Sequence, residues 1–318
     1  MPASSNRPVG TVSQPVFPRL AILPLLALVS ALASSAVHAQ TPGREPALLE
    51  LIPGARSLAL GMALQVSDRD PDLAFVHPAL AVGAGGIRGG YTAFGHAAGG
   101  YTLSAGTDWF GGGVAVSLHS LEYLADPGGP GLREAGLDDF LTEPPSGAGV
   151  SESAATLTYA RTLFGVQVGV SGRFFSQRFA GRRSTGEAVD LGAATSVGPL
   201  KVALSARNLG GDSDLPEELV LGAGAYGRPV GPLDLGAAAQ LRYRDDGEVE
   251  VGAGLEFGYW PIRGRTFVGR VGVRNIPEGS ARPVTVGGSF WGDSLVLDYA
   301  FQPMEGLDGI HRITVGWR

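Results

Sequence analysis

Apolar and polar residues alternate through the second half of the chain. Over residues 249–259 every odd position is apolar and every even position is Glu or Gly. A period of two places the odd side chains on one face of a β-strand and the even side chains on the other. The same alternation recurs over residues 200–207, 233–243, 267–274 and 295–302. The pattern therefore predicts an all-β protein whose strands have one apolar and one polar face.

Turn-forming residues divide the chain beyond residue 85 into fourteen such segments, many of them ten to twelve residues long. Strands of a soluble sandwich average about five to six residues, whereas a tilted strand needs about 9–11 to cross a bilayer. Aromatic residues that suit interfacial girdles stand near the strand ends: Tyr243, Tyr259, Trp260, Phe290, Trp291 and Trp317. The predicted strands are 86–94, 98–106, 110–119, 151–162, 164–177, 186–197, 199–208, 217–226, 231–243, 249–259, 264–275, 282–291, 293–302 and 308–318.

Short and long connections alternate between these segments, and the longest covers residues 120–150. Short periplasmic turns opposite long outer loops are typical of outer-membrane barrels, and an even strand count returns both chain ends to the periplasmic side. An open sheet edge in lipid would leave unpaired backbone groups at several kcal/mol each. The prediction is a transmembrane antiparallel up-and-down β-barrel of about 14 strands, residues 85–318, closed from first strand to last.

The residues before the barrel fall into two parts. Residues 1–39 are typical of a cleaved signal peptide, with a basic start, a ten-residue apolar stretch and Val37-His38-Ala39 at the end. That stretch is too short to cross about 30 Å of hydrocarbon as a helix. Residues 40–84 contain short helical and turn-rich stretches. They are expected to form either a plug in the lumen or a tether at the periplasmic rim, with candidate plug residues Arg56, Asp68, Asp70 and His77.

The composition argues against several other functions. The chain has no Cys, so disulfides, a lipoprotein anchor and thiolate metal sites are excluded. Its formal net charge of −6 argues against a nucleic-acid partner. The five His share no ligand spacing, no nucleophile motif is present, and His119 is expected to be exposed near a strand end. No enzymatic activity, metal site or cofactor is predicted.

The polar face of the predicted strands alternates charged residues with glycine, which suits a crowded lumen. The lumen-facing candidates are Arg173, Lys201, Arg207, Asp234, Arg242, Glu250, Glu256, Arg270, Arg274 and Asp298. One interpretation is a set of salt bridges that hold the barrel and the plug together. The other is a mixed-charge path for a polar or amphipathic solute, in which Arg270 and Arg274 could hold a carboxylate.

Three stretches resemble a known family. They are residues 54–62 followed by an acidic turn and His77-Pro78-Ala79, residues 206–211 with Leu215-Pro216, and residues 297–303 continuing to 309–313. Together they resemble the PorV/PorQ-type outer-membrane proteins and their relatives in the FadL-like superfamily. The resemblance implies a fourteen-stranded barrel with an N-terminal segment entering the lumen. The chain departs from the family at His77, where Asn is usual, and at its Trp317-Arg318 end.

The resemblance implies three alternative functions. A PorV-type protein would receive secreted proteins from a type IX translocon or help attach them at the surface, with residues 120–150 as the partner surface. A FadL-like channel would admit a hydrophobic or amphipathic small molecule, and a third possibility is a structural barrel in outer-membrane lipid. The end motifs match the PorV branch better, so the sequence favours secretion or surface attachment, with secreted proteins or secretion-system subunits as partners.

Overall fold

The computed structural model describes residues 47–50, 54–63, 66, 70–95, 98–125, 148–179, 182–210, 215–230, 233–262, 265–275, 281–304 and 307–317. The predicted signal peptide and Asp68 lie outside the described residues, so both stay predictions. Within the described ranges no helix is long and apolar enough to cross a membrane.

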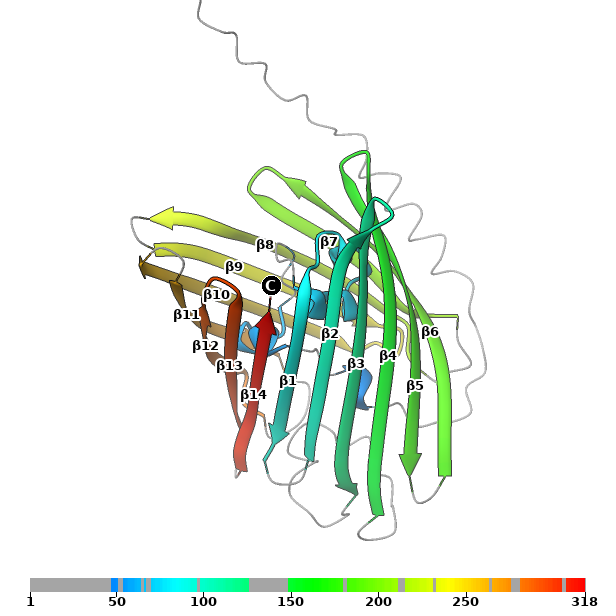
Figure 1. The fold of residues 1–318 in the computed structure, drawn as a ribbon. Coiled ribbons are helices and arrows are strands. Elements are labelled where there is room, and N and C mark those ends of the chain that lie inside the picture. The colour runs from blue at the N-terminus through cyan, green and yellow to red at the C-terminus, as the bar shows by residue number, and fades with distance from the viewer. Residues whose placement is uncertain are drawn as a thin grey trace, which may run out of the picture. The chain divides into compact units, whose positions relative to one another are not determined.

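Fourteen antiparallel strands form one closed barrel, in which β1 pairs with β14 (Figure 1). This confirms the predicted closure and strand number. The strands are β1 (Gly86–Phe94), β2 (Ala98–Trp109), β3 (Gly112–Ala125), β4 (Ala148–Leu163), β5 (Val166–Phe179), β6 (Arg182–Val197), β7 (Leu200–Leu209), β8 (Glu218–Val230), β9 (Leu233–Arg244), β10 (Val249–Ile262), β11 (Arg265–Arg274), β12 (Val284–Trp291), β13 (Leu295–Met304) and β14 (Leu307–Trp317).

Several strands are longer than the sequence predicts. Strand β3 ends at Ala125 rather than at residue 119, and β6 begins at Arg182 rather than at residue 186. The added residues include Ser, Thr and Glu, and their register with the neighbouring strands is unbroken. An antiparallel ladder is made by backbone groups, so it continues where the side-chain alternation becomes too weak to predict a strand.

Two-residue hairpin turns mark one end of the barrel. Phe110 and Gly111 join β2 to β3, and Phe164 and Gly165 join β4 to β5, all four at positive φ. Positive φ at both central residues defines the type I′ turn, whose twist matches that of the flanking strands. We call this end the turn side. The opposite end, where β3 and β4 are separated by residues 126–147, is called the loop side.

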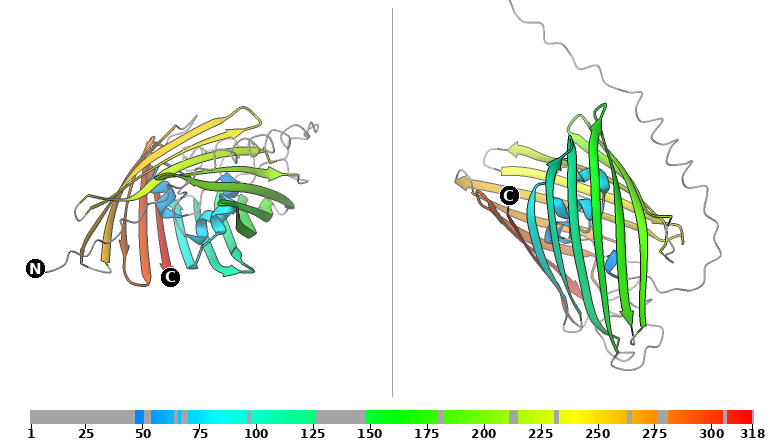
Figure 2. Two further views of the ribbon diagram at one scale, coloured as in Figure 1. Left: turned by 90° about the horizontal axis from the view of Figure 1, so that it is seen from above. Right: turned by 45° about the vertical axis from the view of Figure 1, so that its right-hand side comes forward.

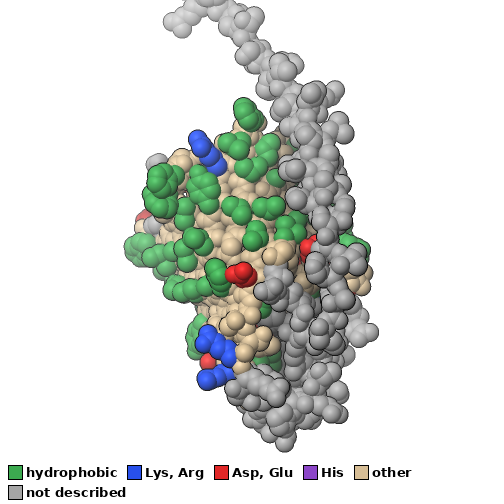
Figure 3. All heavy atoms as spheres, turned by 90° about the vertical axis from the view of Figure 1, so that its right-hand side faces the viewer, with side chains coloured by type: hydrophobic (Ala, Val, Ile, Leu, Met, Phe, Trp, Pro, Cys, Tyr) green, Lys and Arg blue, Asp and Glu red, His purple; other side chains and the backbone are tan. Residues whose placement is uncertain are grey.

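The two faces of the wall differ in polarity. Along β10, Val251, Leu255 and Phe257 are each nearly half exposed, whereas Gly252 and Glu256 between them are buried. On the face shown in Figure 3, hydrophobic side chains are spread over the wall, and Lys and Arg side chains appear near its two ends. The barrel wall therefore has a largely apolar outer surface, and many of its charged residues are buried inside.

The interior is occupied by the chain that precedes β1. This chain contains α2 (Ala47–Glu50), α3 (Ala55–Ala59), the 3-10 helix η1 (Pro71–Phe75) and the 3-10 helix η2 (Pro78–Ala81). Figure 2, seen from above, shows these helices inside the ring of strands. We call the described residues between 47 and 84 the inner segment. Most of its buried apolar side chains belong with inward-facing wall residues to one apolar cluster.

Candidate functional site in the barrel lumen

Inward-facing glycines allow the backbone of the inner segment to lie directly against the wall. A Cβ added at Gly272 would lie 2.0 Å from the amide nitrogen of Gly61, and one at Gly254 would lie 2.7 Å from Cα of Leu60. On the opposite wall, a Cβ at Gly169 would lie 2.5 Å from the carbonyl carbon of Pro78. Any larger residue at these positions would collide with the segment, which explains why glycine alternates with charge on this face.

Buried ion pairs join the inner segment to the wall on the side of β1. The Nε atom of Arg88 lies 2.7 Å from Oδ1 of Asp70 in the inner segment, and its NH1 atom lies 2.9 Å from Oδ2 of Asp298 on β13. A second residue of the inner segment, Asp72, accepts a hydrogen bond from the Ser104 hydroxyl on β2. Two acidic residues of the segment are thereby bound to the adjacent strands β1 and β2.

Further ion pairs link Asp298 to β10 and β11. Arg270 lies 3.2 Å from Asp298 and 2.6 Å from Glu256, and Glu256 in turn lies 2.8 Å from Arg56 of the inner segment. The Arg56 guanidinium also lies 5.1 Å from the ring centroid of Trp291. We call this set the ion-pair layer; its residues are Arg56, Asp70, Arg88, Glu256, Arg270 and Asp298. It binds the segment at two points that are fourteen residues apart in sequence.

A second contact holds the end of η1. Phe75 lies between two wall residues, with the His119 ring 3.8 Å from its own and the Arg173 guanidinium 4.8 Å away. Arg173 also donates a hydrogen bond of 3.0 Å to the Phe75 carbonyl oxygen and pairs with Asp190 at 2.5 Å. The expectation that His119 is exposed is therefore wrong. Its position on β3 points inward, where stacking on Phe75 buries it.

The structure places all ten lumen-facing candidates at inward positions. Buried candidates are Arg173, Arg207, Arg242, Glu256, Arg270 and Asp298, and half-buried ones are Lys201, Asp234, Glu250 and Arg274. Arg207 and Arg242 both pair with Glu218, and Arg242 also pairs with Glu250. Arg270 and Arg274 share no hydrogen-bond or ion-pair partner among the described residues. Arg270 pairs with Glu256 and Asp298, whereas Arg274 donates a hydrogen bond of 2.9 Å to Gln302.

Three of the four plug candidates fall within the described residues, and two of them belong to the ion-pair layer. The third, His77, is fully buried beside Gly192, where an added Cβ would lie 2.9 Å from its Cε1 atom. Burial lowers the pKa of His77 to about 3, so the ring is neutral near pH 7. Burial, reinforced by Asp72 and opposed by Arg88, raises the pKa of Asp70 to about 7.

On the loop side, the part of the lumen wall formed by β1, β3 to β5, β13 and β14 carries buried apolar side chains, a feature that the sequence analysis missed. Phe94 is the last residue of β1 and pairs with Ile310, while Tyr123 on β3 pairs with Val150 on β4. All are buried and belong to the same cluster as Leu48 and Leu49 of α2. We call the following set the loop-side apolar cluster: Leu48, Leu49, Phe94, Leu121, Tyr123, Val150, Phe175, Met304 and Ile310.

One carboxylate lies within this apolar surrounding. Glu152 on β4 is 2% exposed and accepts a hydrogen bond of 2.7 Å from the backbone N–H of Leu48. Its other oxygen accepts from the Tyr123 hydroxyl at 2.9 Å and from the Gln177 amide at 2.8 Å. The three donors satisfy both carboxylate oxygens, which explains how a buried acid is tolerated between apolar side chains.

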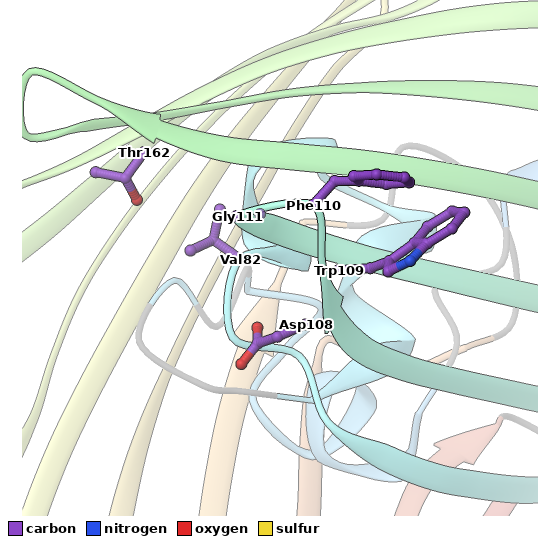
Figure 4. A pocket seen from close by; sticks show the side chains of 7 residues that line it. Val82, Asp108, Trp109, Phe110, Gly111 and Thr162 are labelled. Carbon is purple, nitrogen blue, oxygen red and sulfur yellow. The ribbon is translucent and has the colours of Figure 1, made fainter.

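A pocket of about 540 Å³ lies at the turn side, where the inner segment leads into β1. Val82 contributes from the inner segment, Asp108 and Trp109 from β2, Phe110 from the turn and Thr162 from β4 (Figure 4). The Trp109 and Phe110 rings are 4.4 Å apart and exposed. Among the described residues, no group of three or more His, Asp or Glu side chains is arranged to hold a metal ion.

The fold of this chain is similar to that of solved transport proteins. The Pseudomonas putida toluene transporter TodX matches with a TM-score of 0.57 and 12% identity, over 83% of this chain and 96% of TodX. A TodX deltaS2S3 mutant, described as a monoaromatic hydrocarbon channel, matches with a TM-score of 0.51 and 11% identity, over 83% of this chain and 97% of that one. No protein-family model and no curated protein sequence matches the chain.

Proposed function

We propose that the protein is an outer-membrane channel of FadL-like type that admits a hydrophobic or amphipathic small molecule, with the inner segment as its plug. The apolar outer surface of the barrel suits the hydrocarbon of a bilayer, with lipid as its permanent partner. The glycine contacts and the ion-pair layer support the plug over the tether, because they bind the segment to the wall on several strands. The proposal includes export of the chain by a signal peptide in residues 1–39.

The observation that carries the proposal is the apolar lining on the loop side. A water-filled porin has a polar interior, whereas pockets for small molecules are mostly apolar with a few placed polar groups. Here Phe94, Phe175 and Ile310 face inward, and Glu152 with its partners is the polar group among them. Such a lining favours entry of a hydrophobic molecule, which the toluene transporter TodX also carries on this fold.

The secretion hypothesis and the PorV/PorQ resemblance stay predictions. The surface that would bind secreted proteins was expected within residues 120–150, of which residues 126–147 lie outside the described part of the chain. The similar structures reported above are a toluene transporter and a mutant of it, and this similarity supports transport over secretion or a purely structural role.

Uptake by whole cells tests the proposal. The full-length chain is expressed in a Gram-negative host that lacks its own hydrophobic channel, and uptake of labelled propylbenzene is compared with uptake of a labelled sugar. Assembly is checked by the different gel migration of boiled and unboiled samples. We expect faster propylbenzene uptake with unchanged sugar uptake. Unchanged uptake of both, in cells that contain the assembled barrel, would exclude the channel.

A further inference from the structure

The outer face of β3 to β6 changes from apolar to polar on its way to the loop side. Leu118 on β3 and Phe174 on β5 are exposed side chains of the apolar stretch. Two residues nearer the loop side, outward positions that are register partners across the four strands all carry a hydroxyl group: Ser120, Ser153, Ser176 and Thr185. We call these four residues the hydroxyl row. Because strands in hydrocarbon show apolar side chains on their outer face, the hydroxyl row marks the level at which these strands leave the hydrocarbon.

Two arginines lie directly beyond the hydroxyl row. Arg178 follows Ser176 by two residues on β5, Arg183 precedes Thr185 by two on β6, and both arginines are exposed. They are register partners, which places their Cβ atoms about 4.5–5.5 Å apart. Figure 3, which views the barrel from the side of β5 and β6, shows Lys and Arg side chains gathered near the lower end of the wall. Like charges directly opposite each other destabilise a sheet, so an anion between them would be stabilising.

The described carboxylates do not neutralise this pair. Arg183 donates a hydrogen bond of 2.9 Å from Nε to the Ser176 hydroxyl, and neither arginine forms an ion pair with any described residue. Glu122 stands in the same row as Arg178 but on β3, with β4 between them, which separates the strands by about 10 Å. Glu187 lies four residues from Arg183 on β6, on the other side of the hydroxyl row. Both guanidinium groups therefore have donors left for an external anion.

From this arrangement we propose that Arg178 and Arg183 bind the phosphate of an anionic glycolipid in the outer leaflet. The inference rests on the outer-membrane location in the proposed function and adds a lipid site on the outside of the barrel. A guanidinium group donates through a planar fork that matches phosphate oxygens. The pair lies on the same face as Phe174 and Leu118, so a lipid meets arginines at its phosphate and apolar side chains at its acyl chains. A small free anion would use only the first of these contacts.

The test uses the full-length protein in zwitterionic detergent and native mass spectrometry with two probes, lipid A with both phosphates and lipid A stripped of both. The unmodified protein should bind the phosphorylated form at least about tenfold more tightly, because each arginine near an anionic headgroup adds to binding. Arg178→Gln together with Arg183→Gln should abolish this preference, whereas the two Lys substitutions keep the charges and should retain most of it. Arg161→Gln is the matched control, because Arg161 is an exposed arginine of β4 at the turn side. It should leave the preference unchanged.

The outcomes separate the lipid site from the channel. Equal binding of the two lipids by the unmodified protein, or an unchanged preference in the double Gln variant, would overturn the site. Competition by inorganic phosphate as strong as that by the phosphorylated lipid would identify an anion site without a lipid and would also overturn it. Uptake of propylbenzene should be the same in the double Gln variant and the unmodified protein, so these results leave the channel standing. If the double variant lacks the heat-modifiable band of an assembled barrel, the comparison of the two lipids in the unmodified protein still decides.

Discussion

The turn-side and loop-side halves of the lumen hold the same inner segment by different means. Toward the turn side, the segment is bound by the ion-pair layer and lies against bare glycines, with Arg56 and Asp70 as its charged contacts. On the loop side, Leu48 and Leu49 lie among aromatic and aliphatic wall residues, and the N–H of Leu48 donates to Glu152. The first half is specific for this segment, whereas the contacts of the second could be made by any small amphipathic molecule.

This difference assigns separate roles to the two halves. Charged pairs and backbone contacts require a particular partner in a particular register, which suits a plug that must return to one position. Apolar contacts with one hydrogen bond require only a shape and a donor, which suits a ligand site. A ligand that enters from the loop side would therefore compete with α2 first and leave the ion-pair layer in place.

The largest loss in the free energy of unfolding is expected when the ion-pair layer loses its central carboxylate. Asp298 lies between Arg88 and Arg270, and both guanidinium groups are buried. Asp298→Ala should cost about 3 kcal/mol, the low end for breaking a buried pair, because each arginine keeps one other carboxylate. Urea unfolding in detergent measures the loss.

Asp234→Ala is the control for that variant, since the structure shows no ion pair for Asp234 among the described residues. It should change the free energy of unfolding by less than about 0.5 kcal/mol. Equal losses in the two variants would mean that the ion-pair layer is no more important than any other inward charge.

A smaller effect is expected at the glycine contacts. Gly272→Ala places a methyl group 2.0 Å from the amide nitrogen of Gly61, so the segment must shift. Overpacking of this kind is expected to lower the free energy of unfolding by about 1–3 kcal/mol. Ion conductance in planar bilayers should rise as the segment leaves its place. Gly269 lies on the outward face of the same strand with nothing within 4 Å, so Gly269→Ala should conduct like the unmodified protein. Equal conductance in both variants would contradict the assigned contact.

The smallest effect is expected from pH. The pKa of Asp70 is raised from 3.8 in the unfolded chain to about 7 in the folded protein. Between pH 3.8 and about pH 7 the folded protein therefore binds more protons than the unfolded one. Stability of the docked segment therefore falls as pH rises from about 4 to about 7. Conductance should increase over this range as the docked segment loses stability.

Asp70→Asn cannot titrate and should weaken the rise of conductance over the same pH range, while Asp72, whose pKa burial also raises, retains part of that rise. A decrease of conductance with rising pH in the unmodified protein would contradict the sign of this linkage.

The wall of the barrel was predictable because its signal is local. Alternation within each strand is a property of neighbouring residues, and the closed, even-numbered sheet follows from the cost of unpaired edges. The contacts of the inner segment were not predictable in this way. Arg56 and Glu256 are separated by 200 residues, and nothing near either residue identifies its partner.

The loop-side apolar cluster did leave a signal in the sequence. On β3 the apolar positions change from even to odd: Val116 and Leu118 are exposed, whereas Leu121 and Tyr123 are buried. β5 shows the same change, because Phe174 is exposed and Phe175 is buried. A switch of phase within one strand indicates that the inner face has become the apolar one. His119 was misjudged because it stands just before this switch on β3.

The most direct test of the plug uses the absence of cysteine from the chain. Asp72 of the inner segment and Ser104 of β2 are hydrogen-bonded through their side chains, so this pair is chosen for a test cross-link. Uptake of propylbenzene would be measured in cells that express Asp72→Cys with Ser104→Cys, oxidised and then reduced, with each single variant as control. The account predicts that oxidation stops uptake and reduction restores it only in the double variant. Equal uptake before and after reduction of a verified disulfide would mean that molecules pass without movement of the inner segment.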